Sequence, residues 1–405
     1  MYTLNDRLDG RQRTVQGMLR ASGYRTAIVG KWHLGHGGIY DPTGFDYWNV
    51  LPGQGAYHNP EMIEVDGRHQ HEGYATDIIT DLGLEWLDSL GGDAPFLLMM
   101  HHKAPHRPWQ PGAKHAGMYE DITIPTPDTF DDDYAGRAHA AALATMRIDR
   151  DLTPGDLKQE PPAGLTGEEL KLWKYERFIK DYLRCVASVD DNVGRVLDYL
   201  DRRGLAENTV VIYTSDQGFF LGDHDWFDKR FMYEESLRMP FLVRYPREVR
   251  PGTVTDLMSL NVDFAPTYLD YAGLATPTDV QGRSLRGVFR GERPADWRTS
   301  MYYRYWMRDH ATHNVAPQYG VITYRHKLIY YYDEEWGPKE WELFDLEVDP
   351  RELRNVYAEL AYATTVAEMK SKLRRLRQEL GDTADDWEQE VPRARLPRSV
   401  SWRCW

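Results

Sequence analysis

The feature that most limits how this chain can fold is an apolar run that ends in oxygen-bearing side chains. The run 210–215, VVIYTS, is followed directly by Asp216, Gln217 and a glycine. A β-branched run of this length predicts a buried strand. In an open α/β sheet ligands bind at the carboxyl ends of the strands, and both side chains offer oxygen to a hard cation. Lys229 lies further along and is placed to bind an anion held against that cation. The alternative is an aspartate that only caps a loop.

The same kind of run recurs along the chain and alternates with helical patterns. Strands are predicted at 24–29, 95–102, 210–215 and 240–244, and helices at 14–22, 74–90, 168–203 and 262–274. This alternation predicts an α/β fold with a mostly parallel sheet between helices. The polar, Pro- and Gly-rich stretch 104–162 is expected to be a surface insertion near a site.

The character of the sequence changes near residue 296. Short aromatic, alternating runs such as HKLIYYYD indicate an antiparallel sheet, and a final amphipathic helix is predicted at about 362–380. We therefore expect three parts: an α/β domain at 1–295, a smaller α+β domain at 296–390, and a basic tail at 391–405 that is poorly ordered.

Composition excludes several classes of protein. A net charge of −14 over 405 residues argues against general attraction to nucleic acid or to an anionic membrane. The two cysteines, Cys185 and Cys404, form neither a disulfide framework nor a zinc-site spacing. Cys185 lies in a helical pattern and is expected to be a small buried hydrophobe. No apolar run reaches the length of a membrane span. The polar first residues do not resemble a signal peptide, and the sequence specifies neither a cytoplasmic nor an exported location.

Polar clusters follow three of the predicted strands. The first contains Lys31 and His33 in GKWHLG, where alternate residues of an extended loop point the same way. The alternative there is a solvated loop. The third contains Asp216, Gln217, Lys229, Arg230 and His224, which is placed to face a substrate. Because all these clusters occupy the same topological position, we expect them to form one site.

The second cluster, HHKAPHRP, follows the strand at 95–102. Two prolines restrict the backbone around His106, and a histidine can act as a general acid near neutral pH. A metal site built from His101, His102 and His106 is one alternative, and a His-rich surface loop is another.

Together these blocks resemble the sulfatase family. The blocks GYRTAIVGKWHLG, KAPHRP and VIYTSDQGFFLGDHDWFDKRFMYEESLRMPFLVRYP occur in that order, and the similarity continues to ELFDLEVDPRELRNVY, so that it covers about residues 14–385. The resemblance implies an alkaline-phosphatase-like fold and Ca²⁺-dependent hydrolysis of sulfate esters.

The resemblance also implies roles for individual residues. Lys31 and Lys229 are similar to sulfate-binding lysines, His33 to the histidine that supports a formylglycine nucleophile, and His106 to the acid that protonates the leaving alcohol. Asp216 and Gln217 resemble two Ca²⁺ ligands, with Gln217 where Asn is usual. Substrate contacts are expected from Lys103, His224 and Arg230. Cationic donors suit the transferred group because its charge spreads over the equatorial oxygens.

Two parts of the family pattern are absent from the sequence. No Cys or Ser stands in a Cys/Ser-x-Pro-x-Arg motif, and no paired aspartates of a first strand precede Thr14. We therefore expect a sulfatase truncated at its N-terminus, with no turnover by the chain as written, and with an exposed sheet edge that favours aggregation.

Three functions remain open from the sequence. The leading hypothesis is a sulfatase acting on a small or carbohydrate sulfate ester such as N-acetylglucosamine-6-sulfate. The second is a related phosphodiesterase or phosphonate hydrolase. The third is a non-catalytic protein that binds sulfated glycans through Lys31, His106 and Lys229. The sequence does not specify an oligomeric state.

Overall fold

The computed structural model describes residues 6–91, 94–308, 313–384 and 387. Its helices are α1 (Val15–Ala21), α2 (Ala75–Ser89), α3 (His139–Leu143), α4 (Ile148–Asp151), α5 (Pro154–Leu157), α6 (Gly167–Arg202), α7 (Glu234–Leu237), α8 (Phe264–Tyr271), α9 (Arg286–Phe289) and α10 (Ala363–Glu379). Its strands are β1 (Arg25–Lys31), β2 (Tyr47–Leu51), β3 (Glu61–Glu64), β4 (Gly67–Gln70), β5 (Phe96–His101), β6 (Val211–Thr214), β7 (Phe220–Leu221), β8 (Phe227–Asp228), β9 (Phe241–Arg244), β10 (Ser300–Tyr305), β11 (Gln318–Thr323), β12 (His326–Tyr331) and β13 (Glu340–Asp345). None of the helices within these described ranges is long and apolar enough to cross a membrane.

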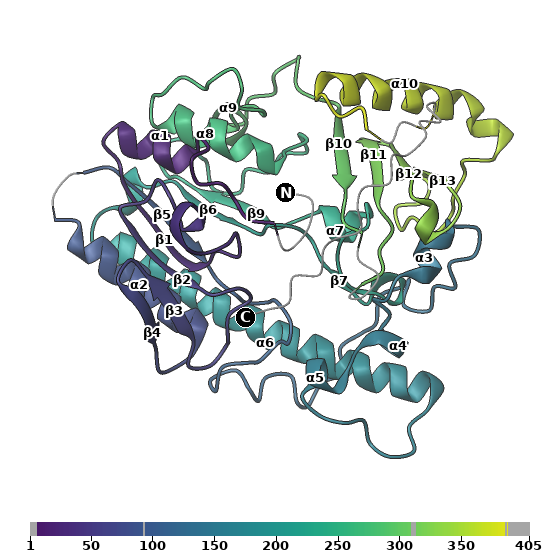
Figure 1. Ribbon diagram of the computed structural model, residues 1–405, viewed down its shortest axis with the longest axis horizontal. Coiled ribbons are helices and arrows are strands. Elements are labelled where there is room, and N and C mark those ends of the chain that lie inside the picture. Colours follow the sequence, from purple (N-terminus) through teal and green to yellow (C-terminus); the bar gives the residue numbers. More distant parts are fainter. Residues whose placement is uncertain (1–5, 92–93, 309–312, 385–386, 388–405) are drawn as a thin grey trace.

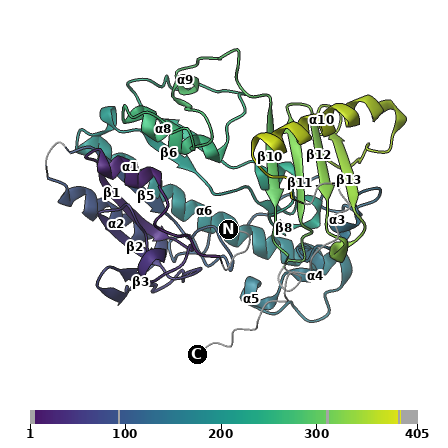
Figure 2. The same cartoon turned by 45° about the horizontal axis from the view of Figure 1, so that its top comes forward.

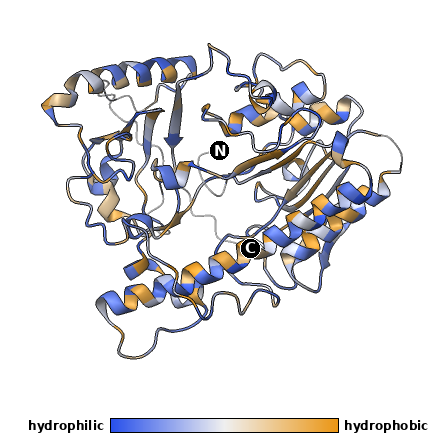
Figure 3. Ribbon diagram, turned by 180° about the vertical axis from the view of Figure 1, so that it is seen from behind, coloured by the Kyte–Doolittle hydropathy of each residue, from blue (hydrophilic) through white to orange (hydrophobic). Residues whose placement is uncertain are grey.

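The larger layer is a sheet in the order β4-β3-β2-β1-β5. Strand β1 pairs in parallel with β2 and β5, so Ala27 lies opposite Tyr47 on one side and Leu98 on the other. Helices α2 and α6 lie below this layer and α1 and α8 above it (Figure 1). Strands β1 and β5 are mainly hydrophobic, whereas the helices carry hydrophobic and hydrophilic stripes (Figure 3). This arrangement confirms the α/β fold with helices on both faces.

Strands β6 and β9 form a separate antiparallel pair, with Ile212 opposite Val243. The runs 210–215 and 240–244 were expected to be buried strands of a parallel sheet, and the structure corrects this. Every residue of β6 is partly exposed, and Leu242 of β9 is 65% exposed. The physical reason is that the outer edge of β6 has no hydrogen-bonded neighbour among the described strands. Strand β5 is partly exposed for the same reason.

The C-terminal sheet is antiparallel throughout, in the order β10-β11-β12-β13. Helix α10 runs across these strands (Figure 2). Met369 and Leu373 of α10 pack on Tyr319 and Leu328 of the sheet. The aromatic alternation of the sequence therefore fills a core between the sheet and the helix, as predicted. Residues 388–405, which contain the expected tail, lie outside the described residues.

The stretch 104–162 is not the surface insertion that its polar composition suggested. Trp109, Ile148 and Leu157 are at most 1% exposed and belong to one apolar cluster with Phe178 of α6. The prediction was wrong because apolar residues of this stretch pack in two buried clusters, one on α6 and the other, which includes Tyr134 and Met146, against Ile329 and Phe344 of the C-terminal sheet.

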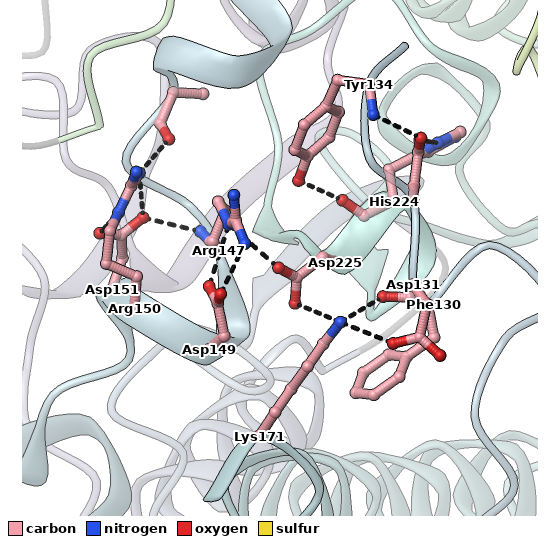
Figure 4. A network of polar contacts seen from close by, with 12 residues as sticks. Phe130, Asp131, Tyr134, Arg147, Asp149, Arg150, Asp151, Lys171, His224 and Asp225 are labelled. Carbon is pink, nitrogen blue, oxygen red and sulfur yellow. Dashed lines mark hydrogen bonds and ion pairs between the residues drawn. The ribbon is translucent and has the colours of Figure 1, made fainter. Parts of the chain in front are cut away.

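A buried ion-pair network connects the N-terminal end of α6 to the stretch 104–162 (Figure 4). Asp225 is 1% exposed and lies between Lys171, at 3.3 Å, and Arg147, at 3.1 Å. Lys171 also contacts Asp131 at 3.0 Å, and Arg147 donates to Asp149 at 2.9 Å. Burial raises the pKa of Asp225 to about 6, and the Lys171 ammonium opposes that shift. The network therefore joins the loop after β7 to α6 and to the segment before α4.

Candidate functional site

The carboxyl ends of β1, β5 and β6 meet at one edge of the molecule. Lys31 is the last residue of β1, and Asp216 follows β6 by two positions. Burial and, after it, the ammonium of Lys229 lower the pKa of Lys31 to about 8, while Asp216 acts in the opposite direction. These electrostatic effects show that the three charged groups, from separate segments, lie close together. The charged groups of these three segments therefore lie in one region, and their shared role in a functional site stays a prediction.

Lys103 is a buried cation on the same edge. Its side chain is enclosed, and Nζ donates to the carbonyl of Gln54 at 3.0 Å and lies 4.8 Å from the centre of the Tyr57 ring. Burial lowers the pKa of Lys103 to about 8, and Lys31 adds to the effect. A buried ammonium with one carbonyl partner favours an incoming anion, because an anion offsets its lost hydration.

His106 is oriented by its own loop. Its backbone N–H donates to the carbonyl of Lys103 at 2.9 Å, and its carbonyl accepts from the hydroxyl of Tyr57 at 2.6 Å. The ring Nδ1 donates to the carbonyl of Arg107 at 2.8 Å, which leaves Nε2 as the nitrogen that can face a ligand. Burial lowers the pKa of His106 to about 3, followed by the charges of Lys229 and Lys31. An anion beside these lysines would raise this pKa toward the range of a general acid.

Arg107 has a structural role next to His106. Its guanidinium makes two hydrogen bonds to Asp156, at 2.9 and 2.7 Å, and lies 5.2 Å from the Phe227 ring centre. This two-bond ion pair between Arg107 and Asp156 fixes the position of the loop that carries His106.

His33 follows β1 in a left-handed backbone conformation, with φ of 49°. Burial lowers its pKa, and Lys31 has the largest effect of the several charged groups that act in the same direction. Gly30, near the end of β1, allows the chain to turn into the loop that carries His33. Its φ is +105°, and a Cβ atom at this position would lie 2.1 Å from the carbonyl oxygen of His101. Only glycine allows β1 to approach β5 so closely at this end.

The alternative metal site of three histidines is wrong for the described residues. His101 directs Nδ1 to the carbonyl of Lys31 at 3.2 Å, whereas Nε2 of His102 contacts the Thr80 hydroxyl of α2 at 3.1 Å. The two rings are thus directed to different partners, and the described residues contain no group of three His, Cys, Asp or Glu side chains that could hold a metal.

Asp216 and Gln217 occupy the strand end as predicted, but they do not complete a calcium site. Asp216 is exposed, and Gly218 beside it packs so tightly that a Cβ atom would lie 2.1 Å from the Glu235 carbonyl oxygen. Within residues 6–91, 94–308, 313–384 and 387, no three His, Cys, Asp or Glu side chains are grouped to hold a metal. Ca²⁺ takes six to eight oxygen ligands. The pair offers only part of such a shell.

Lys229 is held by a buried carboxylate that the sequence patterns did not single out. Asp228 is 1% exposed and lies 3.4 Å from Lys229 Nζ, 2.8 Å from His313 Nε2 and beside the guanidinium of Arg230. Burial opposes ionisation, yet Lys229 and Arg230 hold the pKa of Asp228 well below its ordinary value. His313 comes from the C-terminal part of the chain, 85 positions after Asp228, and no local signal predicts that contact. A substrate contact of Arg230 stays a prediction.

His224 does not face a substrate, which corrects the expectation from sequence. Its side chain is fully buried, its Nδ1 lies 2.8 Å from Asp132, and its carbonyl accepts from the Tyr134 hydroxyl at 2.7 Å. Burial lowers its pKa to about 4, and the neighbouring Arg137 adds to this shift. The turn after β7 points the ring into the core, so His224 has a structural role.

Cys185 does not supply a nucleophile at this edge. Cys185 is fully buried in α6, 3.9 Å from the Tyr74 hydroxyl, and burial raises its pKa to about 11. A thiol with that pKa is not a nucleophile at neutral pH. Its expected role as a small buried hydrophobe is confirmed. Cys404 lies outside the described residues.

Comparison with known proteins gives concordant results. The family model described as Sulfatase matches residues 1–274, and the one described as N-sulphoglucosamine sulphohydrolase, C-terminal, matches residues 222–379. An N-acetylglucosamine-6-O-sulfatase of Bacteroides thetaiotaomicron is 40% identical over 429 residues, which covers 95% of this chain and 75% of the relative.

An N-acetylglucosamine-6-sulfatase of Capra hircus is 27% identical over 308 residues, and the match spans about half of that relative, 51%, and 72% of this chain. A solved structure of a protein in complex with its substrate D-glucosamine-2-N,6-O-disulfate superposes with a TM-score of 0.90 at 39% identity, covering 96% of this chain and 86% of the other.

Proposed function

This chain belongs to the sulfatase family, a family of sulfuric ester hydrolases, and we propose that its site recognises glucosamine sulfated at the 6-oxygen. The observation that carries the proposal is the convergence of Lys31, Lys229 and His106 at one sheet edge. Similarity to N-acetylglucosamine-6-O-sulfatases and to a protein solved with a 6-O-sulfated glucosamine supports the choice of sugar.

In this proposal the lysines bind the sulfate and the histidine serves the leaving group. The ammonium groups of Lys31, Lys229 and Lys103 stabilise negative charge on the sulfuryl oxygens, where it grows during ester cleavage. His106 is neutral in the free protein because its pKa is about 3, and the bound anion raises that pKa so that Nε2 carries a proton toward the sugar 6-oxygen. His33 follows Lys31 by two positions and is placed to hydrogen-bond the bound sulfate.

Asp216 and Gln217 are proposed to contribute two ligands to a Ca²⁺ ion, which would polarise the sulfate when bound. A formylglycine nucleophile has no counterpart in the sequence, because no Cys or Ser precedes x-Pro-x-Arg and Cys185 is buried. We therefore propose that the 405-residue chain binds the sulfate ester without turning it over.

Isothermal titration calorimetry of the full chain tests the binding. N-acetylglucosamine-6-sulfate should bind measurably and unsulfated N-acetylglucosamine at least an order of magnitude more weakly, because charged hydrogen bonds contribute about 1.5–3 kcal/mol each. Lys229→Ala should remove most of this preference, whereas Lys339→Ala, on the surface of the C-terminal sheet, should leave it unchanged. Equal affinity for both sugars would contradict the proposal.

Ion chromatography of released sulfate tests the second part. We expect no sulfate above the rate of a no-protein control, with or without added Ca²⁺. Sulfate release that is lost in His106→Ala would show that the chain carries a nucleophile of its own and would overturn binding without turnover.

A further inference from the structure

We propose that Ser236 of α7 is a positioning residue for the sulfate site, because its hydroxyl and carbonyl oxygens hold the Lys229 segment and the segment after β6 in a fixed relation. This role rests on the proposed function, since its readout is the binding of the sulfated sugar. Helix α7 lies between the α/β layer and the C-terminal sheet (Figure 1), so it is placed to connect the two.

Ser236 accepts hydrogen bonds from two segments that are separate in the sequence. Its Oγ accepts from the backbone N–H of Arg230 at 2.9 Å, and its carbonyl accepts from the N–H of Gly218 at 2.9 Å. Arg230 directly follows Lys229, and Gly218 directly follows Gln217. Ser236 is only 4% exposed, and hydrogen bonds are stronger in such a buried environment than in water. One residue therefore joins the two segments that carry the proposed sulfate-binding and metal-binding side chains.

The backbone on both sides of Lys229 needs such a restraint. Asp228 and Arg230 have φ of 79° and 98°, in a region that residues other than glycine rarely adopt. A conformation of this kind persists only where the surrounding contacts impose it. The N–H of Arg230 is held by the Ser236 hydroxyl, and its carbonyl accepts from the hydroxyl of Tyr303 at 2.9 Å. Loss of the Ser236 hydroxyl would therefore release one of the bonds that keep this backbone in place.

The side chain of Lys229 depends on both segments. Its Nζ lies 3.4 Å from Asp228 and 5.6 Å from the centre of the Phe219 ring, and Phe219 directly follows Gly218. The ammonium group thus contacts the segment that carries it and the segment after β6. A change in the distance between these segments would move Lys229 relative to Asp216 and to the bound sulfate. Hydrogen bonds weaken steeply when their geometry departs from the optimum, so the affinity for sulfate would fall.

The N-terminal end of α7 is fixed to the C-terminal sheet, which gives Ser236 a rigid support. The backbone N–H of Glu234 donates to the Glu352 carboxylate at 2.7 Å. Lys327 of β12 lies 2.6 Å from Glu352 and 2.9 Å from Glu234, and both Lys327 and Glu352 are fully buried. Breaking such a buried ion pair is costly, because each charge would be left without its partner. The C-terminal sheet therefore fixes the position of α7, and Ser236 transmits that position to the site.

A double-mutant cycle separates the positioning of Lys229 from a general role in folding. Calorimetry with N-acetylglucosamine-6-sulfate should compare the full chain with Ser236→Ala, Lys229→Ala and the double variant. Ser236→Ala should weaken the affinity on the order of tenfold, because the ammonium of Lys229 is displaced. In the Lys229→Ala background the same change should cost about twofold at most, because no ammonium is left to displace. Hydrogen exchange of residues 228–232 should also be faster in Ser236→Ala than in the wild type.

Ser284→Ala is the matched control. The Ser284 hydroxyl likewise accepts from the backbone N–H of an arginine, Arg286, at 3.2 Å, but it lies just before α9. This variant should keep the wild-type affinity and the wild-type exchange of residues 228–232. Ser236→Cys keeps the size of the side chain with a weaker acceptor, so its affinity should also fall, and it provides the measurement if Ser236→Ala does not fold.

Three results would overturn the positioning role of Ser236. They are unchanged affinity in the folded Ser236 variants, unchanged exchange of residues 228–232, and an equal loss of affinity with and without Lys229. The last result would assign Ser236 a structural role alone. A wild-type chain that shows no preference for the sulfated over the unsulfated sugar would overturn the proposed function itself, and the role of Ser236 with it.

Discussion

Gly218→Ala is the sharpest test of how the site is built. Gly218 lies between the end of β6 and α7, where its N–H donates to the carbonyl of Ser236 at 2.9 Å. An added Cβ atom would lie 2.1 Å from the Glu235 carbonyl oxygen and 2.5 Å from that of Arg238. Both obstacles are backbone atoms, so the strand end must retreat by more than 1 Å before the Cβ atom reaches ordinary van der Waals contact.

Two terms set the size of the effect. Overpacking costs about 1–3 kcal/mol, and a weakened backbone hydrogen bond adds about 1 kcal/mol. We therefore expect the free energy of unfolding to fall by about 2–4 kcal/mol in urea denaturation. The displaced Asp216 and Gln217 should also weaken 6-O-sulfated glucosamine binding when Ca²⁺ is present.

Gly194→Ala is the matched control. Gly194 lies inside α6, and a Cβ atom there meets nothing within 4 Å. Because alanine is the better helix former, this variant should gain up to about 1 kcal/mol and keep the wild-type affinity. If Gly218→Ala were as stable as Gly194→Ala, the close approach of β6 to α7 would be refuted.

Three further predictions concern charge. The pKa values of Lys31 and Lys103 are lowered to about 8, so both side chains are protonated at pH 7. The affinity for the sulfated sugar should therefore fall as the pH rises from 7 to 9. Constant affinity in calorimetry across that range would contradict a role of these two ammonium groups in binding. Lys171→Met should lower the free energy of unfolding by about 1–3 kcal/mol, because Asp225 loses one of its two cationic partners. The loss is limited because Asp225, whose pKa is about 6, can become neutral by taking up a proton. An unchanged midpoint of urea denaturation would argue against the ion-pair network. His224→Gln should destabilise the fold by about 1–3 kcal/mol without changing sugar affinity, and a selective loss of affinity would restore His224 to the site.

The polar residues at the strand ends could be predicted from the sequence because each of them directly follows an apolar run. Apolar runs followed by Lys31, His106 or Asp216 mark positions that an α/β layer must bring to one edge, and resemblance to a family assigned their chemistry. Lys103 was also found this way, since it belongs to the same block as His106.

The parts that could not be predicted depend on contacts far apart in the sequence. His313 reaches Asp228 across 85 positions, and Tyr57 orients the loop of His106 across 49. His224 was misplaced because the pattern GDHDWFDKR does not reveal that a turn directs its ring toward Asp132. The polar composition of 104–162 likewise hid the few apolar residues that pack on α6.

The central claim is that lysines from separate strand ends bind one sulfate group, and a double-mutant cycle tests it most directly. The affinities of wild type, Lys31→Ala, Lys229→Ala and the double variant for N-acetylglucosamine-6-sulfate should be measured by calorimetry at one pH and ionic strength. If both ammonium groups act on the same anion, the coupling free energy should be at least about 0.5 kcal/mol. Strictly additive losses, or no loss in either single variant, would contradict a shared sulfate site.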